Sequence, residues 1–105
     1  MNGDEIRSKH DQYMMPSTLQ YYAKPIAVDH AKGVWVHDTD GRAYLDFFGG
    51  ILTVSMAHAD PDINGAIKVQ LDRLTHISTL YPNVPVVKLA ETLADMAPGD
   101  ISQNF

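Results

Sequence analysis

The chain has 105 residues, the usual size of one domain, and a formal net charge of -5 from 8 basic and 13 acidic residues, with no cluster of lysine or arginine. Nucleic acid and anionic membrane surfaces are therefore unfavourable partners, and the absence of cysteine excludes disulfides, thiol nucleophiles and cysteine-based zinc sites. The sequence shows no apolar run typical of a signal peptide or a membrane span, so we expect a cytoplasmic protein.

Residues 1–32 are expected to form an N-terminal arm. Its apolar residues have weak periodicity, Pro16 and Pro25 interrupt it, and its best helical stretch is Asp4 to Tyr13. An arm rich in tyrosine and methionine needs a surface to lie against. The tyrosines allow two interpretations equally, a recognition surface or ordinary core; they are Tyr13, Tyr21, Tyr22 and Tyr81.

A β-hairpin is predicted over residues 34–47. Its strands are expected at about Val34 to His37 and about Arg42 to Phe47, because Asp40-Gly41 between them is a strong turn signal. Both strands carry bulky side chains at odd and even positions, which is typical of strands covered on both faces. An apolar loop follows Gly49 and Gly50.

Two amphipathic helices complete the chain. The first is predicted over about 61–76, with Asp60 as N-cap and Pro61 as its first residue. The second is predicted over about 85–97, where Pro98-Gly99 stops it. The elements indicate an α+β fold made of an arm, an antiparallel hairpin or meander and two helices.

Histidines and carboxylates invite a metal site, either His37 with Asp38 and Asp40 or His58 with Asp60. Zinc needs three or four converging ligands, and no two histidines have an i, i+4 helical spacing, so we favour structural histidines. A calcium loop at Asp38 to Gly41 has its glycine misplaced and no closing glutamate. We therefore expect no metal.

The remaining motifs do not predict a catalytic or cofactor-binding residue. Gly49-Gly50 lacks the further glycine or lysine of a phosphate loop and is more typical of a bend. Ser55 and His58 are three residues apart, but we find no carboxylate placed to orient the imidazole, so we expect no catalytic triad.

Four ordered blocks over about Gly33 to Phe105 nevertheless resemble the class III aminotransferases, the ω-amino acid branch of the fold type I pyridoxal phosphate enzymes. The blocks are GVWVHDTDGRAYLDFFGGI, AHADP, AIKVQLDRLTHISTLY and LAETLADMAPGD. Ala57 replaces a common glycine of the family and would be unfavourable there if that position required a positive φ. Asp60 replaces the family's usual residue before the proline, which is Pro61 here. His58 and Pro61 match the family's pattern. The hairpin pattern is matched at Asp38, Gly41, Tyr44, Leu45, Asp46, Phe47 and Gly50.

The resemblance implies that residues 33–105 are part of the small domain of a fold type I enzyme. It implies a substrate-side pocket position for Ile51 and Tyr81. It also implies an interface position for Ser78, Thr79 and Leu80. The parent enzyme would use pyridoxal 5'-phosphate, move an amino group from an amino donor to a 2-oxo acid, and pair this segment with the rest of its chain and with a second subunit.

The family's phosphate-binding turn, pyridine-nitrogen aspartate and Schiff-base lysine have no counterpart in this sequence. The chain alone is therefore expected to bind no pyridoxal phosphate and to be inactive. The alternative is a standalone interaction or dimerisation module; chance similarity of a small α+β domain fits the four ordered blocks less well. In either case we expect exposed apolar faces, with association or partial disorder of the isolated chain. No lysine has the context of the Schiff-base residue; they are Lys9, Lys24, Lys32, Lys68 and Lys88.

Overall fold

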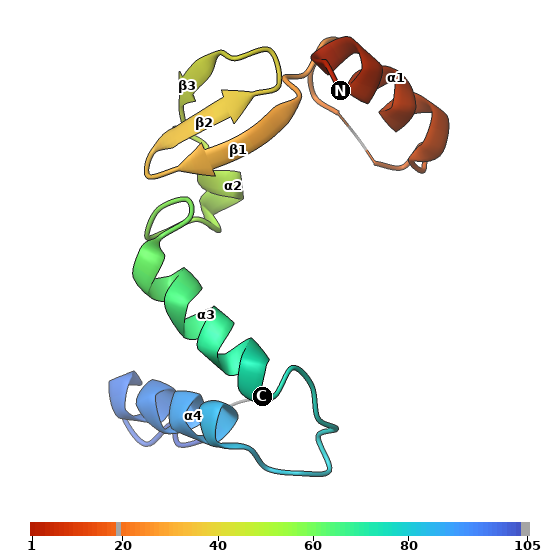
Figure 1. The fold of residues 1–105 in the computed structure, drawn as a ribbon. Helices are drawn as coiled ribbons and strands as arrows, with labels where there is room; N and C mark the ends of the chain where they lie inside the picture. The colour runs from red at the N-terminus through yellow and green to blue at the C-terminus, as the bar shows by residue number, and fades with distance from the viewer. Residues whose placement is uncertain (19, 104–105) are drawn as a thin grey trace. The chain divides into compact units, whose positions relative to one another are not determined.

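The computed structural model describes residues 1–18 and 20–103 (Figure 1). The chain divides into two units, residues 1–68 and residues 69–105, and each is described by itself. The elements in order are α1 (Gly3–Tyr13), β1 (Val28–Lys32), β2 (Trp35–Asp38), β3 (Ala43–Leu45), α2 (Gly49–Leu52), α3 (Pro61–Arg73) and α4 (Val84–Met96).

Helix α1 begins with a capping box, a signal that the weak apolar pattern of this segment did not reveal. The Asn2 side chain accepts a hydrogen bond from the Glu5 amide (2.9 Å), and the Glu5 carboxylate accepts one from the Asn2 amide (3.0 Å). This reciprocal pair satisfies two amide donors that the first helical turn leaves unpaired. The helix expected over Asp4 to Tyr13 therefore starts one residue earlier.

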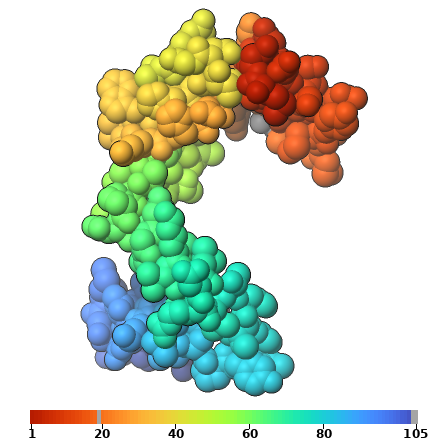
Figure 2. All heavy atoms as spheres, viewed as in Figure 1, coloured from red at the N-terminus to blue at the C-terminus, as the bar shows by residue number. Residues whose placement is uncertain are grey.

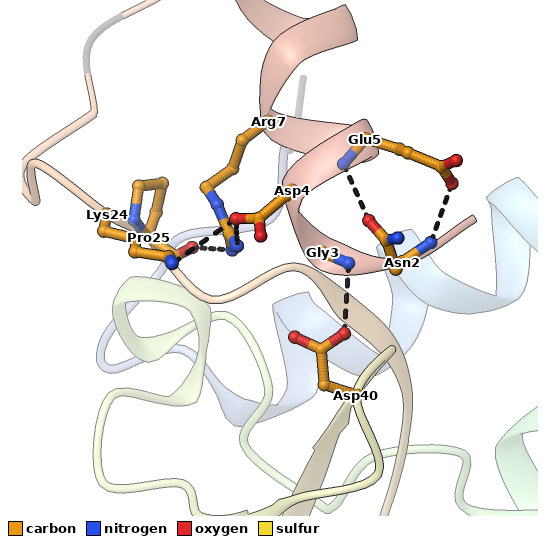
Figure 3. Close-up of polar contacts among 8 residues, drawn as sticks. All are labelled: Asn2, Gly3, Asp4, Glu5, Arg7, Lys24, Pro25 and Asp40. Carbon is orange, nitrogen blue, oxygen red and sulfur yellow. Dashed lines mark hydrogen bonds and ion pairs between the residues drawn. The ribbon is translucent and has the colours of Figure 1, made fainter.

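Helix α1 is fastened to the rest of the first unit by polar contacts (Figure 3). The Gly3 amide donates to Asp40 Oδ1 (3.1 Å), and Arg7 Nη1 donates to the Pro25 carbonyl (2.9 Å). Arg7 Nη2 and the Lys24 ammonium both approach Asp4 Oδ1, at 2.6 and 3.3 Å. The space-filling view shows α1, in red, against the yellow turn that carries Asp40 (Figure 2).

The sheet has three antiparallel strands in the order β1-β2-β3. Strand β1 was not expected, because residues 28–32 lie in the segment assigned to the arm. Its sequence, VDHAK, lacks the apolar alternation of a half-buried strand, and all but one of its residues are exposed. Pairing with β2, interrupted by a bulge between Val28 and His30, makes it a strand.

The β2–β3 hairpin forms around the expected Asp-Gly signal, with shorter strands than predicted. The strands are Trp35–Asp38 and Ala43–Leu45, because residues 39–41 form a loop. The Gly41 amide donates a hydrogen bond to the Asp38 carbonyl (3.2 Å), and the Asp38 amide donates one to the Arg42 carbonyl (3.0 Å). Gly41 has φ +85°, the left-handed conformation that ends such a loop and that glycine adopts without strain.

Both predicted helices are present. Helix α3 is Pro61–Arg73, shorter than the expected 61–76, and Asp60 Oδ1 accepts from the amides of Asp62 and Ile63 (both 3.0 Å) as the predicted N-cap. Helix α4 is Val84–Met96 rather than 85–97, because Asn83 supplies the N-cap to the Val86 amide (3.2 Å).

Burial is low throughout the described residues. Ala27 is the one buried hydrophobic residue of the described chain, and Trp35, Phe47 and Leu80 are among the large apolar side chains that remain exposed. The expectation of uncovered apolar faces is therefore met in the described residues. More large apolar side chains are exposed here than a folded monomer usually leaves in contact with solvent. Their exposure favours a partner that covers them.

Candidate functional site

A groove of about 1080 Å³ lies in the first unit of the described residues. Its floor includes a cross-strand row, Ala31 beside Val36 beside Tyr44, one residue from each strand. The groove is mostly apolar, which is typical of small-molecule sites and of unformed protein interfaces. It is lined by Tyr21, Tyr22, Ile26, Val28, His30, Ala31, Val36, Tyr44, Leu45, Asp46, Phe47, Phe48, Gly50 and His58.

Asp38 is linked to the groove through Tyr44, which lines it. Its carboxylate is buried, with the residue 7% exposed, and accepts from the amides of Asp40 (3.0 Å) and Arg42 (2.8 Å) through Oδ1. Its Oδ2 accepts from the Tyr44 hydroxyl (2.8 Å). The hydrogen bond from the Arg42 amide, with those from Tyr44 and Asp40, lowers the pKa of Asp38 below its ordinary value despite its burial. Asp38 is therefore a hydrogen-bond acceptor that holds the hairpin turn and Tyr44.

Asp46 and His58 form the polar edge of the groove. Asp46 follows β3, and its Oδ2 lies 2.6 Å from His58 Nε2. Its Oδ1 accepts from the amides of Phe48 (2.8 Å) and Gly49 (2.9 Å). Both side chains are largely covered, with 12% of Asp46 and 22% of His58 exposed. One carboxylate thus connects the end of the sheet to two later segments.

This pair corrects the sequence interpretation, which found no carboxylate to orient the His58 imidazole. The hydrogen bond from His58, with those from the Gly49 and Phe48 amides, lowers the pKa of Asp46. An ionised carboxylate can only accept, so His58 Nε2 carries the shared proton. Ser55 is exposed, and among the described residues it makes no hydrogen bond to His58.

The backbone of His58 is also fixed. Its amide and carbonyl exchange two 2.9 Å hydrogen bonds with Gly33, which makes an antiparallel bridge just before β2. Sequence gave no signal for this pairing, because residues 33 and 58 are joined only through the folded hairpin. The replacement Ala57 is not among the residues with positive φ, so alanine is tolerated there; the left-handed residue is Ala59, with φ +52°.

The short element α2, Gly49–Leu52, in the apolar segment after β3 is left-handed and not a right-handed α-helix, and it is called the left-handed turn below. Gly49, Gly50, Ile51 and Leu52 have φ of +54°, +58°, +58° and +63°. A left-handed conformation costs an L-residue roughly 1–2 kcal/mol, and β-branched Ile51 is an unusual residue for it. The turn is closed by the amides of Thr53 and Val54, which both donate to the Gly49 carbonyl (2.9 Å each).

The residues that the resemblance assigns to a site lie in both units. Ile51 belongs to the left-handed turn of the first unit, and its side chain is 67% exposed. Ser78, Thr79, Leu80 and Tyr81 belong to the second unit, between α3 and α4. There Ser78 Oγ accepts from the Leu80 amide (3.3 Å) and its carbonyl from the Tyr81 amide (3.1 Å). Leu80 and Tyr81 are exposed, and their assigned roles remain predictions.

The four tyrosines that allowed two interpretations are all exposed in this chain. Tyr21 and Tyr22 line the groove, whereas Tyr13 ends α1 and Tyr81 lies in the second unit. None of them contributes to a buried core of the described residues, so they are available to a covering surface.

The residues present do not by themselves suit pyridoxal phosphate. No lysine or arginine lines the groove, so it offers neither a Schiff-base amine nor a cation for a phosphate. All five lysines are exposed. Within residues 1–18 and 20–103, no three histidine or acidic side chains gather as a metal site, and no helix is long and apolar enough to cross a membrane.

Comparison with known proteins identifies the family. The sequence model of the class-III aminotransferases matches residues 18–105. The chain is 38% identical over 96 residues to the human mitochondrial alanine–glyoxylate aminotransferase 2, covering 91% of this chain and 19% of that protein. It is 43% identical over 89 residues to the succinylornithine transaminase of Photorhabdus laumondii, covering 85% of this chain and 21% of that protein.

Solved structures give the same result for the fold. A taurine:2-oxoglutarate aminotransferase from Bifidobacterium kashiwanohense, determined with PLP and glutamate, matches with a TM-score of 0.81 and 30% identity over 93% of this chain and 22% of its own. The three-stranded sheet and helices therefore correspond to the N-terminal part of the aminotransferase fold. The chain spans about a fifth of the curated relatives it matches, 19% and 21% for the two above. On this evidence the chain belongs to the class III aminotransferases.

Proposed function

We propose that this chain is the N-terminal part of a pyridoxal 5'-phosphate-dependent transaminase that moves an amino group from an amino donor to a 2-oxo acid. The observation that carries the proposal is the family match over residues 18–105, whose relatives are aminotransferases. The groove supports it, because a mostly apolar surface edged by Asp46 and His58 is suited to be completed by further protein.

In this proposal the 105 residues contribute structure and substrate-side surface but no catalytic group. The groove has no lysine, and the five lysines of the chain are exposed, so the Schiff-base amine comes from elsewhere in the enzyme. Ile51 and Tyr81 face the substrate side, and Ser78, Thr79 and Leu80 lie at the interface with a second subunit. The homodimer and a cytoplasmic location belong to the same proposal, although three relatives are named as mitochondrial proteins.

The chemistry is tested with the intact protein that contains this segment. Alanine, acetylornithine and taurine serve as donors, with glyoxylate and 2-oxoglutarate as acceptors, since these classes occur in the names of related proteins. Formation of a new amino acid from the 2-oxo acid is the expected result. Absence of transfer with every pair, in protein that contains bound cofactor, would contradict the proposal.

The inactivity of the 105 residues is tested separately. Pyridoxal phosphate is titrated into the purified chain, trapped with borohydride and located by peptide mass, while light scattering gives the mass in solution. We expect no stoichiometric adduct. An adduct on one lysine of a compact species would show that the chain carries its own cofactor site.

The alternative, a standalone interaction module, is favoured by the exposed apolar groove alone. It predicts that the 105-residue chain is the natural product and binds a full-length relative or a complementary segment. Western blotting of the native protein distinguishes the two, because the enzyme proposal requires a polypeptide several times longer.

A further inference from the structure

The left-handed turn at Gly49–Leu52 is held in a conformation that its own residues do not favour. Four successive residues have φ between +54° and +63°, and two of them, Ile51 and Leu52, are not glycine. Such runs persist only where surrounding contacts determine the backbone, and they concentrate at functional sites.

The start of the turn is held by Asp46. Asp46 Oδ1 accepts from the amides of Phe48 and Gly49 (2.8 and 2.9 Å), which fixes the backbone where the left-handed run begins. Asp46 is itself anchored to the sheet, since its amide donates to the Val34 carbonyl (2.9 Å).

The orientation of that carboxylate is set by His58. His58 Nε2 lies 2.6 Å from Asp46 Oδ2, and the His58 backbone exchanges two 2.9 Å hydrogen bonds with Gly33. The backbone of His58 is thus fixed independently of the contact between its imidazole and Asp46. A carboxylate held through both oxygens cannot rotate away from the amides of the turn.

We propose that Asp46 and His58 are positioning residues that hold the left-handed turn, and through it the side chain of Ile51, so that the turn sets which amino donors fit the substrate side. This inference rests on the proposed transaminase function. The two residues act through backbone geometry and do not touch the substrate themselves.

The test uses the intact enzyme with His58→Ala. We expect KM for amino donors to rise by about tenfold with kcat changed less than about twofold, because binding is lost and not the chemical step. The rise should differ between a short donor such as alanine and a long one such as ornithine, since a displaced Ile51 changes the shape of the pocket. An equal loss for all donors would indicate a merely structural role and overturn the inference.

Amide hydrogen exchange supplies a readout that does not depend on activity. The Thr53 and Val54 amides close the turn on the Gly49 carbonyl, so their exchange should be faster by about tenfold or more in His58→Ala. Unchanged exchange at both amides would show that His58 does not hold the turn.

Two variants separate the hydrogen bond from the loss of a ring. His58→Gln places an amide N–H near the position of Nε2 and should restore most of the exchange protection and donor preference. His10→Ala is the matched control, because His10 is a similarly exposed histidine beside an aspartate, with Nδ1 3.7 Å from Asp11. It should leave both readouts unchanged; a change as large as that of His58→Ala would overturn the specific role of His58.

A double-mutant cycle tests whether His58 acts through Ile51. Ile51→Ala alone should alter donor preference, and His58→Ala should add little to it in that background. Fully additive effects would overturn the link to Ile51. If the wild-type enzyme transfers no amino group at all, the proposed function fails and the specificity claim with it, while the exchange data still judge whether Asp46 and His58 hold the turn.

Discussion

The Tyr44 hydroxyl donates a 2.8 Å hydrogen bond to Asp38 Oδ2 from the neighbouring strand of the hairpin. The other oxygen of the same carboxylate accepts from the amides of Asp40 and Arg42. One buried acid therefore closes the turn and orients an aromatic ring that lines the groove. The hairpin and the candidate site depend on the same side chain.

Replacing Asp38 should open the hairpin turn. In Asp38→Ala the amides of Asp40 and Arg42 lose their acceptor, so their exchange should approach that of an unprotected loop. Tyr44→Phe removes only the hydroxyl and should leave both amides protected. NMR exchange of the two variants makes the comparison, and equal protection in Asp38→Ala and wild type would contradict this role of the carboxylate.

Acid should weaken the hairpin. Hydrogen bonds, first from the Arg42 amide, lower the pKa of Asp38 from its reference value of 3.8. A group whose folded pKa is depressed stabilises the fold above its unfolded pKa, and that contribution is lost as the pH falls below about 3.8 through the folded value. Amide exchange at Arg42 followed between pH 5 and 2 should show protection lost in that window; Asp38→Asn should remove the dependence.

Two glycine-to-alanine changes should have opposite effects. Gly41 has φ +85°, so alanine there should destabilise the hairpin by about 1 kcal/mol through backbone strain. Gly65 lies inside α3, and a Cβ there meets nothing within 4 Å, so alanine should stabilise that helix by about 0.5–1 kcal/mol. Amide exchange in the hairpin during denaturant unfolding measures the effect of Gly41→Ala. Helical circular dichroism during the same unfolding measures the effect of Gly65→Ala. A stabilising Gly41→Ala would show that the loop has another conformation in solution.

Gly3→Ala should break the hydrogen bond of α1 to Asp40 without unfolding the helix. A Cβ at Gly3 would lie 2.8 Å from Asp40 Oδ2 and 3.1 Å from Arg7 Nη1, so the Asp40 carboxylate in Figure 3 has to move away from the Gly3 amide. Alanine favours the helix itself, and the Asn2–Glu5 capping box is not disturbed. The helical secondary chemical shifts of α1 should therefore persist, while the amide of residue 3 loses its protection from hydrogen exchange. Simultaneous loss of helical shifts would mean that docking, not the cap, maintains α1.

The isolated 105-residue chain should associate. Leu89 and Leu93 are exposed on α4, at 60% and 44%, and buried hydrophobic residues are nearly absent from the described chain. Leu89→Lys with Leu93→Lys should lower the mass seen by light scattering and reduce binding of an apolar dye. A wild-type chain that is monomeric and binds no dye would contradict the idea that these faces await a cover.

Local sequence patterns predicted most of the helices and the hairpin. Asp40-Gly41 predicted the hairpin, Asp60-Pro61 predicted the start of α3, and apolar spacing predicted α4, because turns, caps and amphipathic faces depend on neighbours in the chain. The ordered blocks also predicted the family that the comparisons show. The boundaries shifted by up to three residues, since caps such as that of Asn83 decide where a helix begins.

Local sequence patterns specify the individual elements and the family, whereas the folded chain specifies the geometry of the candidate site. Strand β1 has no apolar alternation, and pairing with β2 makes it a strand. Asp46 and His58 stand twelve residues apart in the sequence, and their side chains meet because the Asp46 amide bonds to the Val34 carbonyl while His58 is bridged to Gly33. Hydrogen bonds between distant segments depend on where the folded backbone places them, and no local pattern in the chain contains that information.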